Sequence, residues 1–269
     1  MIDILLPVYN GEKYLSQQLE SIICQTIPNW RLLIRDDGSS DSSTDIVNEY
    51  ASRNSDKISI TRDRLGNIGT TRCINILLEQ TDSSYIMFCD QDDIWEPNKI
   101  EVSMREMQNL EKKFPNMPLL VCSDACCIDG KNQLLCSSFF DSQKFVNTIT
   151  DVHKMLALNI VQGSTVLMNK KAKEVIYPIP NGLYHDWWTA VNVVFYGKVH
   201  YIHQPLMRYR QHQSNVVGAL DVGPRYLLQK LSHVKKQMGI YRLMYNSLKF
   251  KPSIIKWAYY KLIFNLNRL

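Results

Sequence analysis

The chain has 269 residues, of which 45% are hydrophobic, so it can bury a full core as one large or two small domains. Its seven cysteines follow no regular spacing, and its first residues lack the basic region of a secretory signal. These features exclude a disulfide framework and predict reduced cysteines in the cytoplasm. Cys122, Cys126 and Cys127 lie close together, but a fourth ligand at suitable spacing is missing, which favours core packing over a zinc site.

The net charge of +5 is unevenly distributed along the chain. Residues 222–269 contain ten Lys or Arg and no Asp or Glu, which leaves 21 basic and 26 acidic groups in residues 1–221. Such asymmetry is typical of an appended segment that meets an anionic surface. We therefore expect a main domain over residues 1–221 and a basic, aromatic-rich helical extension over residues 222–269.

Apolar periodicity predicts alternating strands and helices over the first 90 residues. The expected strands are residues 2–8, 31–35, 58–61 and 84–89, and the expected helices are residues 14–25, 42–51 and 70–80. This order with short connections predicts an α/β fold with a Rossmann-like, mostly parallel, doubly wound sheet. The absence of GxGxxG and of a P-loop lysine motif excludes the common dinucleotide-binding and NTPase sites.

Beyond Lys113 the alternation loosens, which predicts a small mixed second sheet. Residues 119–126, 161–168, 199–202 and 206–210 are expected to be strands, and residues 170–177 and 184–196 helices. Residues 133–148 are polar and are expected to form a loop.

Three carboxylates follow directly after an apolar strand, since Asp90, Asp92 and Asp93 come after Cys89. Carboxylates this close repel each other unless a positive charge joins them. Mg²⁺ or Mn²⁺ would do so, and the carboxyl end of a strand is where open α/β sheets bind ligands. The alternative is a solvated acidic turn, or a cap for a helix that starts near Pro97.

Six motifs occur along the chain in the order typical of one enzyme family. They are residues 6–15 (LPVYNGEKYL), 36–41 (DDGSSD), 67–69 (NIG) with Arg72, 90–93 (DQDD), 185–188 (HDWW) and 209–217 (YRQHQSNVV). Together they resemble the inverting family 2 glycosyltransferases, which have the GT-A fold. The last three motifs are most similar to the rhamnosyltransferase-like branch of bacterial surface polysaccharide synthesis, which builds O-antigen and capsule. The resemblance covers residues 2–218.

The resemblance implies a nucleotide site at the ends of the first strands. Its residues would be Pro7, Val8, Tyr9, Asn10, Asp37, Asn67, Gly69, Arg72 and Asp90. Asp37 would contact the base, and Asp41 would cap the following helix. The alternatives are an ordinary strand-to-helix turn capped by Asn10 and a surface salt bridge made by Arg72.

The resemblance also implies a divalent metal, Mn²⁺ or Mg²⁺, held by Asp90, Asp92 and His212. An inverting transferase needs one base that deprotonates the acceptor hydroxyl, and Asp186 fits this role. The alternatives are a helix cap for Asp186 and a solvated surface histidine for His212.

The sugar and acceptor side would be formed by Gly163, Ser164, Thr165, His185, Trp187 and Trp188. The missing side chain of Gly163 would leave room for a sugar ring. The two tryptophans could stack on sugar rings and exclude water, or they could belong to the core.

The basic extension contains an apolar stretch, residues 253–266, which is too short to span a ~30 Å bilayer core. Its mixture of Lys, Arg, Trp, Tyr and Leu is typical of helices that lie in a membrane interface. The alternatives are a helix pair packed on the main domain and a nucleic-acid-binding tail, of which the latter is not expected.

The resemblance implies transfer of a sugar from a UDP- or dTDP-sugar to a saccharide or polyprenyl-linked glycan. The enzyme would be cytoplasmic and peripheral on the inner face of the cell membrane. L-Rhamnose from dTDP-rhamnose is the favoured sugar, and glucose, galactose or an N-acetylhexosamine from UDP are the alternatives. A nucleotidyltransferase that releases pyrophosphate and a non-catalytic sugar- or lipid-binding module remain the rivals from other classes.

Overall fold

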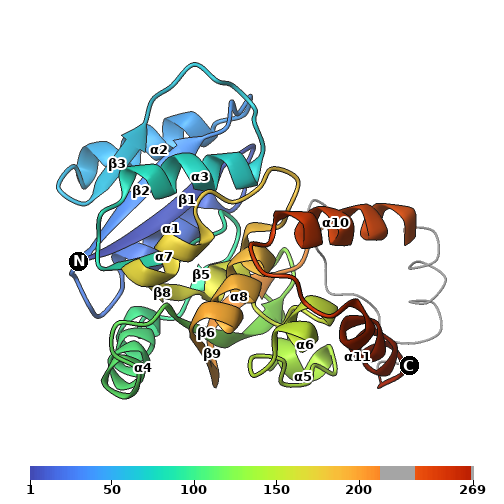
Figure 1. Cartoon of the computed structure of the whole chain (residues 1–269). Coiled ribbons are helices and arrows are strands. Elements are labelled where there is room, and N and C mark those ends of the chain that lie inside the picture. Colours follow the sequence, from blue (N-terminus) through green and yellow to red (C-terminus); the bar gives the residue numbers. More distant parts are fainter. Residues whose placement is uncertain (213–233, 268–269) are drawn as a thin grey trace.

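The computed structural model describes residues 1–212 and 234–267 of an α/β protein (Figure 1). The strands are β1 (Ile2–Val8), β2 (Trp30–Asp36), β3 (Ile58–Thr61), β4 (Tyr85–Phe88), β5 (Ile94–Trp95), β6 (Leu119–Ile128), β7 (Leu134–Cys136), β8 (Leu167–Asn169) and β9 (Lys198–Arg210). The helices are α1 (Leu15–Ile23), α2 (Ser43–Arg53), α3 (Thr70–Gln80), α4 (Lys99–Lys113), α5 (Phe139–Ser142), α6 (Val152–Ala157), α7 (Lys170–Ile176), α8 (His185–Tyr196), α10 (Val234–Ser247) and α11 (Ile254–Asn267). The expected domain boundary between residues 221 and 222, and residues 213–217 of the last motif, lie outside the described residues.

Within the described ranges the strands form one sheet in the order β3-β2-β1-β4-β8-β6-β9-β5, with β7 attached to β6. The strands β3, β2, β1 and β4 are parallel to their neighbours, which confirms the α/β alternation expected for this half. The expected second sheet is continuous with the first, because β8 pairs antiparallel with both β4 and β6.

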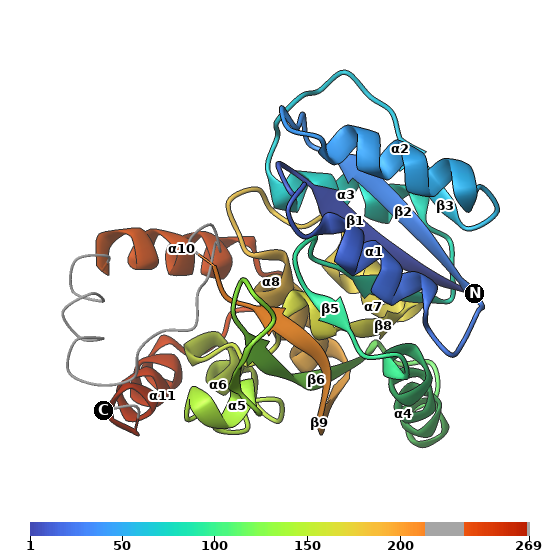
Figure 2. The same ribbon diagram turned by 180° about the vertical axis from the view of Figure 1, so that it is seen from behind.

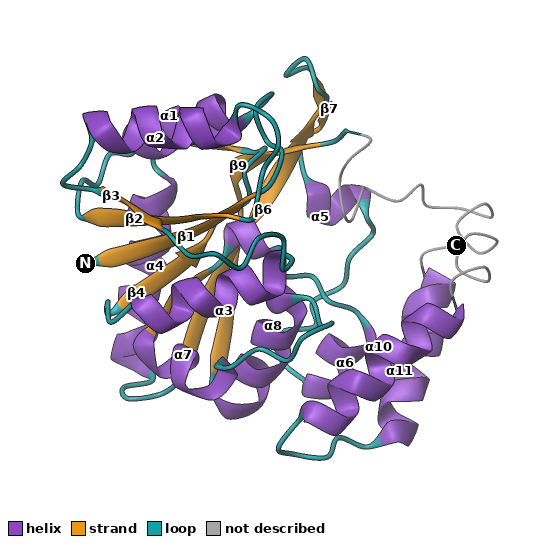
Figure 3. Ribbon diagram, turned by 90° about the horizontal axis from the view of Figure 1, so that it is seen from above, coloured by secondary structure: helices purple, strands orange, loops and turns teal. Residues whose placement is uncertain are grey.

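Helices cover both faces of the sheet (Figures 2 and 3). Side chains that alternate along β1 enter different layers: Ile4 and Leu6 pack with α1, α2 and α4, whereas Leu5 packs with α3, α7 and α8. Strands buried on both faces are expected to be largely apolar, and β1 is apolar apart from the buried Asp3. The packing fixes the direction of β1, β2 and β4, so that their carboxyl ends meet at one edge.

Three expected elements differ from the structure. Residues 163–165 form a 3₁₀ turn rather than part of a strand, because the N–H of Thr165 bonds to the carbonyl of Gln162, and β8 begins only at Leu167. The two expected closing strands are a single strand, β9, whose pairing with β6 shifts register between Ser123 and Asp124. The expected polar loop over residues 133–148 contains β7 and α5.

The two C-terminal helices pack on the rest of the protein (Figure 3). The ring of Tyr241 in α10 lies 5.1 Å from that of Trp187, and Phe250 stacks on Phe195 at 3.6 Å. In α11, Nζ of Lys261 donates to the carbonyl of Ala157 in α6 at 2.8 Å. Among residues 1–212 and 234–267, no helix combines the length and the apolar composition that a membrane span needs.

Candidate functional site

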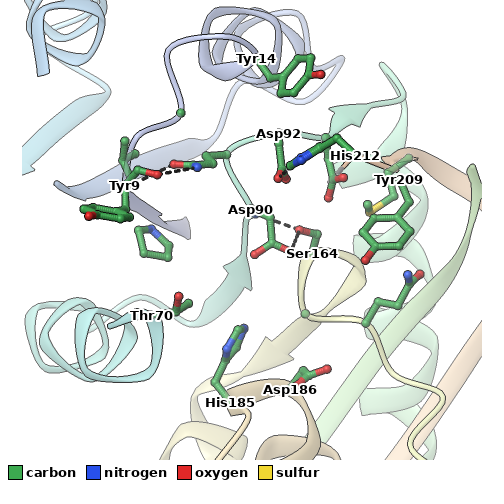
Figure 4. Close-up of a pocket in the computed structure, with 18 of the residues that line it drawn as sticks. Tyr9, Tyr14, Thr70, Asp90, Asp92, Ser164, His185, Asp186, Tyr209 and His212 are labelled. Carbon is green, nitrogen blue, oxygen red and sulfur yellow. Dashed lines mark hydrogen bonds and ion pairs between the residues drawn. The ribbon is translucent and has the colours of Figure 1, made fainter. Parts of the chain in front are cut away.

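A cleft of about 1140 Å³ opens at the carboxyl ends of β1, β2 and β4 (Figure 4). It is lined by residues 7–14, which include the end of β1 and the segment after it, and by residues 90–93 after β4. The 3₁₀ turn and the start of α8 also line it. The end of β9 and the residues that follow it complete the wall. This is the position where an open α/β sheet binds its ligand.

The cleft brings together most of the predicted site residues. Those that line it are Pro7, Val8, Tyr9, Asn10, Asp37, Asp90, Asp92, Gly163, Ser164, His185, Asp186, Trp187 and His212. The predicted residues Asn67, Gly69, Arg72, Thr165 and Trp188 are not part of its lining.

The acidic end of the cleft contains Asp90 and Asp92. Ser164 holds Asp90 in two ways, because its Oγ accepts the Asp90 N–H and donates to Asp90 Oδ2, both at 2.8 Å. Nε2 of His212 lies 2.8 Å from Oδ2 of Asp92. Ser164, predicted on the sugar side, therefore positions an acidic residue (Figure 4).

Burial, and then the charge of Asp90, raises the pKa of Asp92, while His212 opposes this effect. Behind them, burial and the same carboxylates raise the pKa of Asp93, whose Oδ2 has no hydrogen-bond partner among the described residues. Within that part of the chain, no three His, Cys, Asp or Glu side chains are grouped as a ready-made metal site. The donor set still suits a hard divalent cation, because oxygens of Asp90 and Asp92 and the imidazole of His212 line one cleft.

Asp186 occupies the first turn of α8, where the helix dipole favours a negative charge. Its Oδ2 accepts a hydrogen bond from Nδ2 of Asn159 at 3.2 Å. Burial raises the pKa of Asp186, and the neighbouring His185 and the N–H of Trp187 only partly offset this. Asn159 was not predicted, because it lies 27 residues before its partner and in no motif.

Gly163 leaves room for the imidazole of His185 and also lines the cleft, so its place beside a sugar ring stays a prediction. A Cβ at position 163 would lie 2.7 Å from Nε2 of His185, closer than real Cβ contacts come. The imidazole also packs edge-on against Phe88, with ring centroids 5.0 Å apart. His185 is thus held in the cleft wall beside Asp186 (Figure 4).

On the predicted nucleotide side of the cleft, Asp37 is held by a buried arginine that belongs to none of the motifs. Arg35 forms ion pairs with Asp37 and Asp63, and both Arg35 and Asp37 are buried. Asp37 also accepts the N–H groups of Ile68 and Gly69, each at 2.8 Å. Burial alone would raise the pKa of Asp37, but these two N–H groups and Arg35 together lower it.

This clamp explains where two of the predicted residues lie. Asn67 and Gly69 belong to the loop that Asp37 and Arg35 hold, and Gly69 adopts a φ of 84°. Arg72 is exposed on α3 and forms no ion pair with another described residue, so the alternative of a surface salt bridge is not seen there.

Gln91, the middle residue of the Asp-x-Asp motif, joins the nucleotide side to the acidic end. Its Oε1 accepts the N–H of Tyr9 at 2.8 Å, and its Nε2 donates to the Tyr9 carbonyl at 2.9 Å. Asn10 does not cap α1, because its Oδ1 accepts the N–H of Ser40 at 2.8 Å. Asp41 accepts the N–H of Ser43, the first residue of α2, although the residue at the N-cap position is Ser42.

The two tryptophans are buried. The indole N–H of Trp187 donates to the carbonyl of Met155 at 3.0 Å, and Trp187 is among the residues that line the cleft. The indole N–H of Trp188 donates to the carbonyl of Ile176 at 2.7 Å, away from the cleft. Trp188 therefore belongs to the core, which was one of the two alternatives.

Arg210, fully buried on β9, ties the acidic segment to its surroundings. Its Nε donates to the Asp92 carbonyl at 2.7 Å, and its backbone N–H donates to Oδ1 of Asp93 at 3.1 Å. Its Nη2 reaches Gln17 in α1 at 2.8 Å, and the guanidinium lies 4.4 Å from the ring centre of Tyr14. Arg210 thus fixes the backbone of the residue whose carboxylate meets His212.

The profile of Glycosyl transferase family 2 matches residues 3–172, more than half of the chain. An uncharacterized glycosyltransferase of Rickettsia typhi is 25% identical over 81% of this chain and 66% of its own length. The Escherichia coli UDP-Glc:alpha-D-GlcNAc-diphosphoundecaprenol beta-1,3-glucosyltransferase WfgD is 31% identical over 45% of this chain and 47% of its own length. The chain thus spans less than two thirds of the length of these curated relatives.

Two solved structures share the fold over 99% of this chain and 72% of their own. Staphylococcus aureus TarS in complex with UDP-GlcNAc superposes with a TM-score of 0.65 at 16% identity. The mannosyltransferase PcManGT from Pyrobaculum calidifontis, in complex with GDP-Man and Mn²⁺, superposes with a TM-score of 0.60 at 14% identity. The chain has the GT-A fold and belongs to glycosyl transferase family 2.

Proposed function

We propose that this protein is a metal-dependent, inverting glycosyltransferase of bacterial surface polysaccharide synthesis. The observation that carries the proposal is that one cleft contains both Asp186, at the start of α8, and the acidic pair Asp90 and Asp92 (Figure 4). Inversion at a sugar carbon needs a base on one side of the sugar and a leaving diphosphate on the other. A cleft with a carboxylate base on one wall and a cation site on another meets this need.

In the proposed reaction, an acceptor hydroxyl attacks the anomeric carbon of the donor sugar while the bond from that carbon to the diphosphate breaks. Asp186 takes the hydroxyl proton, and the nucleoside diphosphate leaves with the electron pair of the broken bond. Asn159 orients Asp186 through its hydrogen bond to Oδ2. Trp187, which lines the cleft next to the base in the sequence, would keep water from it.

The cation would be Mn²⁺ or Mg²⁺, held by Asp90, Asp92 and His212. When bound, it would neutralise the charge that develops on the departing diphosphate. It would also give the buried Asp92 a positive partner, against the effect of burial and of Asp90 on its pKa. The Mn²⁺ complex of PcManGT supports a cation at such a site in this fold.

The donor would be a UDP- or dTDP-sugar, with its nucleoside along residues 7–10 and beside Asp37. The UDP-GlcNAc bound to TarS supports a uridine donor. The rhamnosyltransferase-like motifs favour dTDP-rhamnose, and UDP-glucose, UDP-galactose and UDP-N-acetylhexosamines are the alternatives. Asn67 and Gly69 would act through the loop that Asp37 holds, and Arg72 would act from α3, the helix that follows this loop.

The acceptor would be a saccharide on a polyprenyl carrier, bound on the side of Gly163, His185 and Trp187. The acceptor in the name of WfgD, a GlcNAc-diphosphoundecaprenol, supports this class. Such an acceptor lies in a membrane, so we place the enzyme in the cytoplasm, peripheral on the inner face of the cell membrane. Residues 222–269, with ten basic and no acidic side chains, would make the contact.

The test is nucleotide release from a panel of UDP- and dTDP-sugars with Mn²⁺ or Mg²⁺ and a lipid-linked acceptor extract. We expect one donor to yield an intact nucleoside diphosphate, and Asp186→Asn to lower the rate about 10²–10⁴-fold. Asp92→Ala should abolish the metal-dependent release, because it removes a ligand of the cation. Release of pyrophosphate would instead indicate a nucleotidyltransferase, and donor binding without turnover in any extract would indicate a binding module.

A further inference from the structure

The outer face of α11 carries an uncovered apolar stripe. Ile255, Tyr259, Leu262 and Leu266 are spaced by four, three and four residues, so they share one side of the helix. Their exposed fractions are 83%, 60%, 62% and 59%. Four large apolar side chains in a line on one helix form a contiguous surface, which monomeric proteins seldom leave to water without a function.

The opposite face of α11 is already occupied, so the helix cannot rotate to bury the stripe. Phe264 is buried, and the ring of Trp257 lies 4.9 Å from that of Tyr241 in α10. Lys261 donates to the carbonyl of Ala157 and to the hydroxyl of Tyr241. The stripe is therefore presented outward by contacts that fix the helix on α6 and α10.

The charge around the stripe selects its partner. Residues 222–269 contain no acidic side chain, and the exposed Lys249, Lys251 and Lys256 belong to α11 or to the segment that leads into it. A second copy of this chain would bring cations against cations across a two-fold contact. An anionic bilayer offers apolar volume to the stripe and negative headgroups to the lysines.

We propose that Ile255, Tyr259, Leu262 and Leu266 bind the surface of an anionic lipid bilayer, and that this contact brings the acceptor side of the cleft to the membrane. The second claim, that the acceptor side of the cleft comes to the membrane, follows from the path of the chain and rests on the proposed function. The helix α11 lies beside α6 (Figures 1 and 3), and α6 leads through Leu158 to Asn159, which bonds to Asp186. The helix α6, which contacts α11, therefore ends only two residues before Asn159, the residue that bonds to the proposed base.

The test uses the full chain and vesicles of phosphatidylcholine, either alone or mixed equally with phosphatidylglycerol. We expect the protein to float with the mixed vesicles and to remain largely unbound with phosphatidylcholine alone. Ile255→Ser combined with Leu262→Ser should lower binding to the mixed vesicles about tenfold or more, since each removes an inserted apolar side chain. Both residues are exposed, so the variant should melt at the same temperature as the wild type.

Leu134→Ser combined with Leu135→Ser is the matched control, because these leucines are 65% and 58% exposed on β7, far along the chain from α11. It should bind the vesicles as the wild type does. Equal flotation of the α11 variant and the control, or no flotation of the wild type, would overturn the proposal. So would a dimer in light scattering that the α11 variant abolishes in the absence of lipid.

The outcome is separable from that of the proposed function. Turnover of a donor with a soluble saccharide acceptor needs no membrane, and the α11 variant should retain it. A chain that turns over this donor but does not bind vesicles contradicts the docking surface alone. A chain that binds vesicles but turns over no donor contradicts the proposed function alone.

Discussion

Nδ2 of Asn159 donates a hydrogen bond to Oδ2 of Asp186 at 3.2 Å, and this bond favours the charged form of a carboxylate whose burial favours the neutral one. We expect Asn159→Ala to raise the pKa of Asp186 further and to lower kcat at neutral pH about tenfold, the effect of one hydrogen bond to a charged group. The pH profiles of kcat and of kcat/KM measure these changes. Asn75→Ala is a suitable control, because Asn75 bridges backbone atoms of Ile179 and does not touch the cleft. If the activities of the wild type and of Asn159→Ala fall at the same pH on acidification, Asn159 does not control the pKa of Asp186.

The raised pKa of Asp186 also sets the direction of two effects of pH. A base must be deprotonated, so activity should fall on acidification with an apparent pKa above 3.8, the ordinary value for an Asp. A carboxyl group whose pKa is raised by folding costs stability once the pH exceeds its unfolded value. Asp186→Asn should therefore lose the acid limb and most of the activity, yet melt at a higher temperature than the wild type near pH 7. Calorimetry at pH 4 and pH 7 would detect this, and an equal or lower Tm at pH 7 would argue against the buried charge.

Gly163 and His185 should behave as one unit. A Cβ at position 163 would meet only the far end of the His185 ring and the Cβ of Asp186, so Gly163→Ala should displace the imidazole at a small cost to the fold. We expect activity to fall as far in Gly163→Ala as in His185→Ala, and the double variant to be no worse than either. Such non-additivity is the signature of two residues in contact. Additive losses would instead show that Gly163 contributes to the site independently of His185.

The fold and the acidic end of the cleft are predictable from the sequence because their signals are local. Predicted strands of the parallel half that are followed closely by Asp37, or by Asp90 and Asp92, place those carboxylates at one sheet edge without knowledge of any contact. The role of Asn159 could not be predicted, because a polar residue in a loop acquires it only when α6 and α8 pack together. The role of Arg35 could not be predicted either. A charged residue inside a strand ordinarily indicates an exposed face, whereas Arg35 is buried and forms ion pairs with Asp37 and Asp63. The contact of Gly163 with His185 could not be predicted either, because the space beside a glycine is a property of the packed structure.

Arg210 and His212 grip Asp92 from two directions, at its carbonyl and at its carboxylate. If this carboxylate holds a cation, the geometry of Arg210 should control metal affinity although Arg210 is not itself a ligand. We expect Arg210→Lys to weaken Mn²⁺ binding about 10–100-fold, the usual effect of losing a group that orients a metal ligand, because an ammonium cannot replace the guanidinium fork. Arg208→Lys is the matched control, since Arg208 lies two residues earlier on β9 and pairs with Glu96 at an exposed site.

Titration with Mn²⁺ followed by electron paramagnetic resonance gives the two affinities directly, without an assay of turnover. The wild-type affinity should also rise with pH, because a cation binds the deprotonated form of Asp92 and burial raises the pKa of that group. Equal affinities for Arg210→Lys and Arg208→Lys, with both proteins folded, would mean that Asp92 is held in place by His212 alone or does not bind the metal. A weaker affinity for Arg210→Lys only, with the wild-type KM for the acceptor, would place Arg210 in support of the cation and separate its role from that of Asn159 at the base.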